Sequence, residues 1–396
     1  MNSKTFLQAF FGIMLTLVIN GCVEPIDLTT ETFESALVIE ATITDELEEQ
    51  EILLSRTFRL EEDGPSEETN ADVSVVSSAG EQFDFREASP GRYASVNPFQ
   101  AEAGKTYTLE ITTSDGRNYS SEPTDLPAAS NLQDLHAERA TVRGEEGVAL
   151  FVDAQASGNS SGYYIYRYEE TYKIISPFSY PLDLIYVNGS FVEVPKTKEE
   201  RVCYNTVGSQ GIVLANTTAQ TGNDLDDFLL RFLKIDDEKI RHRYSILVKQ
   251  YAVSEDAFSF YETLKDFSGS ENLFSQNQPG FINGNVFSVS NADEKVIGFF
   301  NVAAVDTERI FFDLLDFFDQ SEIPYIYREC EIGRPSVENP VQVESFGELL
   351  MSGRVKYLGY TNLPGGPGEG PYRVVQANCV DCTLKGSNEA PEFWTE

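Results

Sequence analysis

The sequence predicts a mainly β fold, with an N-terminal immunoglobulin-like β-sandwich followed by a larger β-rich domain that contains at least one helix. Three observations lead to this prediction. Short runs rich in β-branched and aromatic residues recur along most of the chain. Turn-forming residues separate those runs at short intervals. Only one segment has a clear helical period.

The first domain spans residues 35–127 and has the most regular strand pattern. About seven strand-like runs fit into about 90 residues, which is typical of an immunoglobulin-like sandwich. The dipeptide Asp115-Gly116 lies between two of these runs and predicts a tight hairpin. The expected strands are 37–44, 51–57, 71–77, 81–86, 91–96, 105–112 and 117–121.

A second, larger domain is expected over residues 128–396. Two prolines and several small residues interrupt the strand pattern at 123–129, which we interpret as a linker. Segments 161–172 and 243–253 contain enough β-branched and aromatic residues to be strands. Two further segments contain apolar clusters without a clean period, and each fits a helix or a strand equally well: 223–233 and 311–318.

One helix is predicted over residues 255–267. Ser254 precedes it and has the hydroxyl side chain that N-cap positions favour. Two acidic residues in the first turn lie near the positive end of the helix dipole. Apolar residues recur at i, i+3, i+4 and i+7, so this face is expected to pack into the core: Ala257, Phe260, Tyr261 and Leu264.

The chain has 396 residues and is strongly acidic. It contains 64 acidic and 29 basic residues, which gives a formal net charge of −35. Because binding to phosphate backbones requires clustered basic residues, the composition argues against a nucleic-acid partner. An anionic membrane surface would also repel the protein. Since 41% of the residues are hydrophobic, the chain is nevertheless expected to be globular rather than disordered.

Residues 1–21 have the features of a lipoprotein signal peptide. Lys4 and the free amine form a positive region, and an apolar stretch from 6 to 19 follows it. This stretch is too short to cross a bilayer comfortably. It ends in Ile19-Asn20-Gly21-Cys22, which resembles a bacterial lipobox, so we expect lipidation and membrane anchoring at Cys22. The alternative is an ordinary signal peptide whose cleavage site happens to lie near a cysteine.

Residues 22–34 are polar and lack apolar periodicity, which predicts a tether between the lipid and the first domain. The rest of the sequence has no run of about 18 apolar residues, so we expect contact with the membrane through the lipid anchor only. Glu24 and Asp27 follow the anchor cysteine. Acidic residues at such positions resemble a surface-sorting signal of some lipoprotein systems, which favours the exterior over the periplasm.

Four cysteines remain after Cys22, and their even number favours disulfides. Exported chains commonly pair their cysteines, and four cysteines allow three pairings. A four-thiolate zinc site is an alternative, but only one of the two pairs has close spacing. A redox-active C-x-x-C is another, but this pair lies in an irregular tail rather than at a helix N-terminus. The expected disulfide residues are Cys203, Cys330, Cys379 and Cys382.

No catalytic arrangement stands out in the sequence. Residues 158–162 match the G-x-S-x-G pattern of serine hydrolases, but a tyrosine-rich strand follows instead of the helix that this motif needs. His242 lies between two arginines, which disfavour its protonated form. His136 has no nucleophile or metal-ligand partner at a telling spacing. We therefore expect a non-enzymatic protein with no cofactor and no metal site.

Several motifs, taken in order, resemble one known family. The first-strand sequence LVIEATITD and the hairpin GKTYTLEITTSDGRNYSS are followed by RYSILVKQY, NGNV and VIGFF. The chain closes with CVDCT, a glycine and PEFW, and this C-terminal signature is the most specific element. Over nearly the whole mature chain these motifs are similar to the lipoproteins grouped as domain of unknown function 4249. Tyr204 departs from the pattern, since the family would have a tryptophan there.

The resemblance implies a cellular context rather than a reaction. Lipoproteins of this family look like outer-membrane accessories, typically encoded beside TonB-dependent transporters. We therefore expect a lipid-anchored outer-membrane protein at the cell surface, which assists a TonB-dependent transporter in nutrient capture or gating. Two alternatives stay open: a surface enzyme that acts on a polymer, and a factor in outer-membrane assembly or adhesion.

Overall fold

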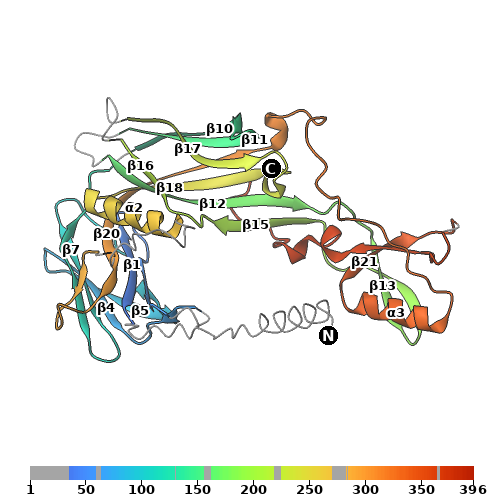
Figure 1. Cartoon of the computed structure of the whole chain (residues 1–396), viewed down its shortest axis with the longest axis horizontal. Helices are drawn as coiled ribbons and strands as arrows, with labels where there is room; N and C mark the ends of the chain where they lie inside the picture. The colour runs from blue at the N-terminus through green and yellow to red at the C-terminus, as the bar shows by residue number, and fades with distance from the viewer. Residues whose placement is uncertain are drawn as a thin grey trace, which may run out of the picture.

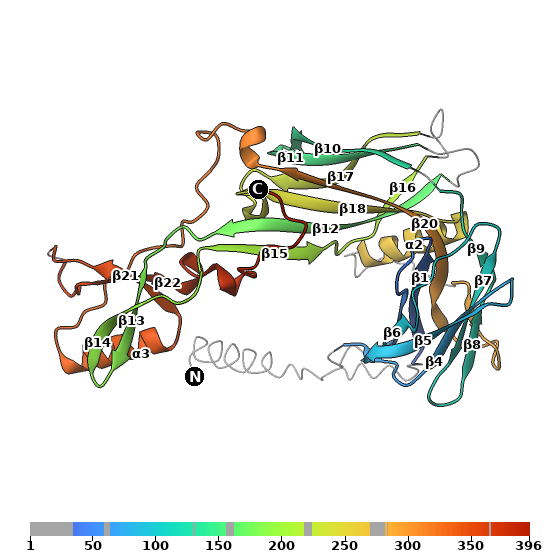
Figure 2. The same cartoon turned by 180° about the vertical axis from the view of Figure 1, so that it is seen from behind.

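The computed structural model describes residues 35–58, 64–129, 131–155, 162–217, 224–269, 282, 284–363 and 366–396. The predicted signal peptide, the tether and Cys22 lie outside these ranges, as do residues 158–161 of the G-x-S-x-G match. Figures 1 and 2 show an elongated molecule with a strand-built part at one end, layered sheets in the middle and a smaller arm at the other end. Strands far outnumber helices within the described residues, so the mainly β prediction is confirmed. No helix in these ranges is both long enough and apolar enough to cross a bilayer.

Each of the seven strands expected in the N-terminal part has a counterpart within a few residues of the predicted bounds. They form one continuous ladder in the order β1-β2-β6-β5-β4-β7-β8, so the specifically immunoglobulin-like arrangement stays a prediction. Buried and exposed residues alternate along most of β1 and β7, as expected for strands with one face on a core. The strands are β1 (Leu37–Thr44), β2 (Glu51–Arg56), β4 (Asp72–Ser77), β5 (Gln82–Ser89), β6 (Arg92–Ser95), β7 (Thr106–Thr112) and β8 (Asn118–Ser121), with the short β3 (Ser66–Glu67) and β9 (Thr124–Asp125) beside them.

The core of this N-terminal part includes residues from far downstream. β19 (Val286–Ser288) pairs with β8, and the first half of β20 (Val296–Phe312) pairs in parallel with β1. Gly298 of β20 has a φ of +153°, and an added Cβ there would lie 2.3 Å from the backbone oxygen of Ile39. Only glycine therefore allows β20 to approach β1 this closely.

The middle of the molecule consists of two facing sheets (Figure 1). The second half of β20 pairs with β18, and β18 pairs with β12, which also pairs with both β15 and β16. The facing sheet has the order β10-β11-β17, so the described part of the ambiguous segment 223–233, from 224 onwards, is a strand. The bounds are β10 (Asn131–Val142), β11 (Glu145–Gln155), β12 (Tyr163–Ile175), β15 (Val202–Gly208), β16 (Val213–Asn216), β17 (Asp224–Lys234) and β18 (Tyr244–Ala252).

Aliphatic and tyrosine side chains fill the space between the two sheets. Val148, Leu150 and Val152 of β11 are fully buried against Tyr166 and Tyr244 of the facing sheet. The second ambiguous segment, 311–318, is the end of β20 followed by the 3-10 turn η2 (Leu314–Asp316), and another such turn, η1 (Glu238–Ile240), precedes β18. Seven of the 19 tyrosines of the chain are buried in the described residues, where each large ring covers a substantial apolar area.

The predicted helix is present as α2 (Glu255–Gly269). The hydroxyl of Ser254 accepts a hydrogen bond from the backbone N–H of Ala257 at 3.1 Å, which is the expected N-cap contact. Ala257 and Phe260 are buried against Phe299 of β20, so the predicted apolar stripe packs into the core.

A small subdomain projects from the end of the middle sheets that lies away from the N-terminal strands (Figures 1 and 2). We call residues 177–200 and 324–381 the distal arm. Two chain segments that are far apart in the sequence meet in it. The arm contains β13 (Leu182–Val187), β14 (Ser190–Pro195), the helix α3 (Pro340–Met351), β21 (Val355–Tyr360), β22 (Tyr372–Gln376) and the turn η3 (Ala377–Cys379), and η4 (Cys382–Leu384) follows it.

Candidate functional site

Two disulfides lie where the distal arm joins the middle sheets. Cys203 of β15 is bonded to Cys382, and Cys330 is bonded to Cys379. This is one of the three pairings that the sequence left open. Because all four sulfur atoms are used in disulfides, they are not available as thiolates for the alternative zinc site or for redox chemistry.

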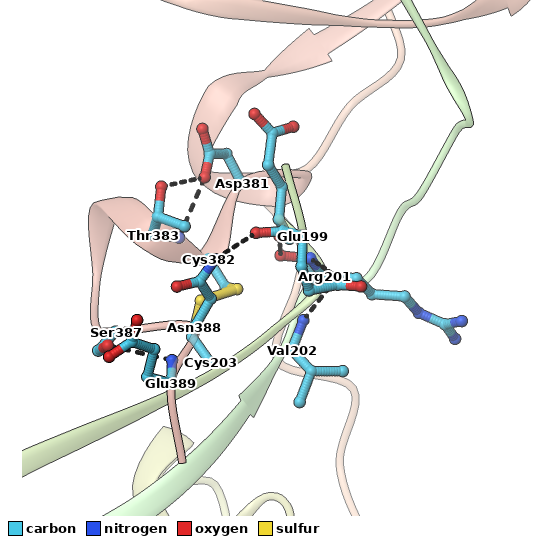
Figure 3. Close-up of a disulfide and its surroundings, with 12 residues drawn as sticks. Glu199, Arg201, Val202, Cys203, Asp381, Cys382, Thr383, Ser387, Asn388 and Glu389 are labelled. Carbon is cyan, nitrogen blue, oxygen red and sulfur yellow. Dashed lines mark hydrogen bonds between the residues drawn. A yellow bond between two sulfur atoms is a disulfide. The ribbon is translucent and has the colours of Figure 1, made fainter. Parts of the chain in front are cut away.

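The Cys203–Cys382 disulfide is surrounded by hydrogen bonds that join the two segments of the chain (Figure 3). The backbone N–H of Cys382 donates to the carbonyl of Glu200 at 2.8 Å. Asp381 accepts a hydrogen bond from the backbone N–H of Thr383 at 3.0 Å, which caps the turn η4. Cys203 and Cys382 are almost completely buried, so the junction is a packed part of the structure.

A half-buried lysine also holds the two segments together. The Nζ of Lys356 in β21 lies 2.8 Å from a carboxylate oxygen of Glu200 and 3.1 Å from one of Asp381. Burial alone would lower the pKa of Lys356, but these two carboxylates raise it above its usual range. Glu200 also accepts a bond from Lys196 at 2.6 Å. The junction therefore combines covalent, ionic and apolar contacts.

The arm has a small core of its own. Leu184, Phe346, Tyr357 and Val374 are buried together, one residue from each of β13, α3, β21 and β22. The close packing depends on Gly347 of α3, where an added Cβ would lie 2.3 Å from the ring of Tyr186. This core is much smaller than those of the N-terminal and middle parts.

The outer surface of the arm exposes many apolar side chains. Nine of the 19 large hydrophobic residues that are exposed among the described residues belong to the arm, although the arm is far shorter than the rest of the chain. Val341 and Leu363 are the most exposed, at 76% and 74%. Scattered single apolar residues are normal on a surface, but a concentration of them marks a candidate contact surface. The nine are Ile185, Val187, Val192, Tyr325, Ile332, Val341, Met351, Tyr360 and Leu363.

A second candidate is an acidic groove where β1 and β2 of the N-terminal part meet β12, β18 and α2. Its volume is about 360 Å³. Partial burial raises the pKa of Glu48 at its edge. Arg167 also lines the groove, with its guanidinium 5.7 Å from the ring centre of Tyr251. The titratable lining residues are Glu40, Glu48, Glu49, Glu51, Arg167, Tyr251 and Tyr261.

The two histidines lie in very different surroundings. Burial, together with the positive charges of Arg241 and Lys173, lowers the pKa of His242 to about 4, so this side chain is neutral at physiological pH. His136 was expected to stand alone, but the fold places it beside Asp134 and Asp153. Asp153 belongs to the next strand of the sheet, and no sequence spacing pointed to that contact.

Comparison with known families decides the classification. The sequence model described as "Domain of unknown function (DUF4249)" matches residues 23–309. The chain belongs to the DUF4249 family. The resemblance drawn from the sequence motifs is therefore confirmed. The match ends within β20, so Cys330, Cys379 and Cys382 lie beyond the matched residues of this DUF4249 protein. Tyr204, where a tryptophan was expected, packs edge-on against Trp394 with ring centres 5.0 Å apart.

The other comparisons add no information on the function of the DUF4249 protein. No curated protein matches its sequence. Among solved structures, trypsin-activated alpha-2-macroglobulin from Escherichia coli aligns at 9% identity and a TM-score of 0.17, over 57% of this chain and 15% of that one. A DUF4785 family protein from Legionella pneumophila aligns at 9% identity and a TM-score of 0.16, over 55% of this chain and 51% of that one. The DUF4249 chain thus spans a minor part of the first protein and about half of the second.

Proposed function

We propose that this DUF4249 protein is a non-enzymatic, lipid-anchored accessory of a TonB-dependent outer-membrane transporter, and that the distal arm is its docking surface. The observation that carries the proposal is the concentration of exposed apolar side chains on an arm that two disulfides hold at its junction. The lipobox at Cys22 and the family context suggest the outer membrane as the place of action.

Physical reasoning favours a protein partner for this surface. Exposed apolar area is unfavourable in water by about 25 cal/mol per Å², so the exposed apolar side chains of the arm gain free energy when a partner covers them. A rigid arm loses little conformational entropy on docking, which leaves more of that gain for affinity. Because the arm has a small core, the disulfides and the Lys356 ion pairs supply the rigidity that its own packing cannot.

The test is affinity purification of the full chain from outer membranes solubilised in a mild detergent. A TonB-dependent transporter is expected to co-purify at comparable abundance. The double variant Val341→Asp, Met351→Lys is expected to lose it, because it places two charges on the exposed surface of α3. The aspartate falls in the first turn and the lysine in the last turn, where each charge favours the helix dipole, so folding is not expected to suffer.

Leu315→Asp provides the matched control, since Leu315 is 60% exposed but lies on η2 outside the arm. Recovery of the wild-type chain without any transporter at comparable abundance would refute the proposed function. Loss of the transporter in the Leu315 control, or its retention in the double variant, would refute the arm as the docking surface.

The acidic groove favours a second candidate function, a surface enzyme that acts on a polymer. A carboxyl group with a raised pKa beside other carboxylates is a common arrangement in polysaccharide hydrolysis. This candidate function predicts that the wild-type chain releases reducing ends from cell-surface polysaccharides. Glu48→Gln should lose this activity, and Glu110→Gln on the exposed face of β7 should keep it. Equal release by wild type and Glu48→Gln would refute it.

A further inference from the structure

Three ligand-type side chains meet on the outer face of the β10-β11-β17 sheet. Asp134 of β10 lies directly opposite Asp153 of β11 in the antiparallel register. His136 follows two residues after Asp134 and therefore points to the same face. One potential ligand atom from each of these residues lies within 4.8 Å of the other two, which is close enough for a single metal ion to contact all three.

One nitrogen of the His136 imidazole makes no hydrogen bond to the described residues. Its Nδ1 is buried and has no hydrogen-bond partner among the described residues. The nearest polar atom is Oδ2 of Asp134 at 3.0 Å, but the two atoms are not aligned for a hydrogen bond. A positive ion between Nδ1 and this carboxylate oxygen would be attracted by both atoms, because the lone pair and the carboxylate both carry negative charge. A separation of about 3 Å is what two ligands of one small divalent ion adopt.

The negative charge around this imidazole is not balanced by basic residues. Asp134 and Asp153 form a cross-strand pair of like charges, which destabilises a sheet. Neither carboxylate has a lysine or arginine partner among the described residues, and His136 is the only basic side chain paired with Asp134 there. A bound cation would relieve this repulsion.

The strands on both sides of Asp153 depart from regular pairing beside it. The register of β10 shifts between Leu132 and Asp134, and the pairing of β17 shifts opposite the stretch from Val152 to Ala154. At the second shift Asp227 has a φ of +49°, a left-handed conformation that is uncommon for a residue with a side chain. Its backbone N–H donates to Oδ1 of Asp153 at 2.7 Å, which fixes the orientation of that carboxylate.

Asp227 also faces the other side of the imidazole. Its Oδ1 lies 3.6 Å from Nε2 of His136, and the ring of His136 stacks on Phe151 with centres 5.6 Å apart. In metal sites, a histidine that binds through one nitrogen usually directs its other N–H to a carboxylate, which sets the tautomer and orients the ring. Asp227 is placed to do this for His136, so that Nδ1 keeps its lone pair for the ion.

We propose that Asp134, His136 and Asp153 bind a divalent metal ion of the zinc class, with Asp227 as the carboxylate that orients His136. The nitrogen ligand favours Zn²⁺ and similar transition-metal ions over Ca²⁺ and Mg²⁺, which prefer sites made of oxygen atoms alone. The proposal is independent of the docking arm, because the three ligands belong to the β10-β11-β17 sheet.

The test measures Zn²⁺ binding to the full chain, purified in detergent with a tag that contains no histidine. Competition with a chromophoric chelator gives the stoichiometry and the affinity. Free thiols are counted first, because reduced cysteines would also bind zinc. We expect one Zn²⁺ per wild-type chain and a higher Tm in its presence. His136→Gln and Asp153→Asn are expected to lower the affinity by about 100-fold, and Asp227→Asn by about 10-fold, as is usual for an orienting residue.

His242→Gln is the matched control, because it removes the only other histidine of the chain and leaves the three ligands intact. It is expected to bind Zn²⁺ as the wild type does. If the wild type bound Zn²⁺ no more tightly than His136→Gln, the proposal would be overturned, and the three side chains would form only a histidine–carboxylate ion pair. Equal losses in His242→Gln and His136→Gln would also overturn it, as would tighter binding of Ca²⁺ than of Zn²⁺.

Discussion

Replacing Cys330 and Cys379 by alanine tests whether a covalent bond holds the arm in its folded form. The two cysteines are separated by 49 residues, and the bond closes this loop in the unfolded chain. On the chain-entropy view, a loop of this length contributes about 4 kcal/mol of stability at 25 °C, which strain and residual structure reduce. Alanine is preferable to serine because Cys379 is 1% exposed and a buried hydroxyl would add a cost of its own.

Hydrogen exchange, followed by mass spectrometry, measures the effect in each part of the chain. If the arm opens as a unit, amides in β21 and β22 of the variant should exchange up to about a thousand-fold faster, since 1.4 kcal/mol corresponds to a factor of ten. Amides in β4 and β7, at the other end of the molecule, should exchange as in the wild type and provide the internal control. Unchanged exchange in β21 and β22, or equal acceleration in β4 and β7, would refute the reasoning.

Three further changes have defined outcomes. Burial alone would raise the pKa of Glu170, but hydrogen bonds from Lys239, a tyrosine and an arginine lower it. Glu170→Gln should therefore lower the free energy of unfolding at pH 7 by about 3–5 kcal/mol in chemical denaturation, because two cations lose their partner. Since the pKa of Glu170 is depressed in the folded state, its stabilising contribution is fully present above the unfolded pKa of about 4.3 and is lost as the pH falls through the folded pKa. The unfolding free energies of wild type and variant should therefore become equal in acid, and a difference that does not change with pH would contradict the assignment. Gly284→Ala should lower Tm sharply, because its Cβ would lie 1.5 Å from a backbone oxygen of β20. In the control Gly189→Ala, the added Cβ meets no atom and only the φ of +79° is unfavourable, so Tm should fall less in the same thermal unfolding experiment. Cys22→Ala should move the protein out of the membrane fraction in cell fractionation, and full retention there would refute the lipid anchor.

Local sequence signals predicted the strands of the N-terminal part and the helix α2, because these elements are specified by residues close together in the chain. The N-cap at Ser254 and the apolar stripe of α2 needed no distant partner to be recognised. The pairing of β20 with β1 could not be predicted in this way, since Ile39 and Gly298 are far apart in the sequence. The helix α3 was missed although Asn339 caps it and Pro340 begins it, both of which are ordinary start signals.

The candidate sites show the same division between local and distant information. An even number of cysteines in an exported chain pointed to disulfides, but only the fold selects Cys203 with Cys382. The sequence around His136 gives no spacing typical of a metal-binding motif. The alternation of a strand already placed Asp134 on the same face, and this local signal could have been used. Asp153 required the β10-β11 register, which the sequence does not specify uniquely.

The disulfides lie where they can stabilise the arm and limit its movement. Its two apolar clusters contain eight buried residues, far fewer than the cores of the N-terminal and middle parts, so apolar burial alone gives it little stability. The Cys203–Cys382 bond joins β15 of the middle sheets to the chain just after the arm, and Lys356 links the same two segments at Glu200. The Cys330–Cys379 bond closes a loop within the second segment of the arm. Bonds at the tip would stabilise the fold of the arm but leave its angle to the middle sheets free. The Cys203–Cys382 bond at the junction restricts that angle, so a partner docked on the arm as proposed would be held at a set position relative to the acidic groove and to the N-terminal strands.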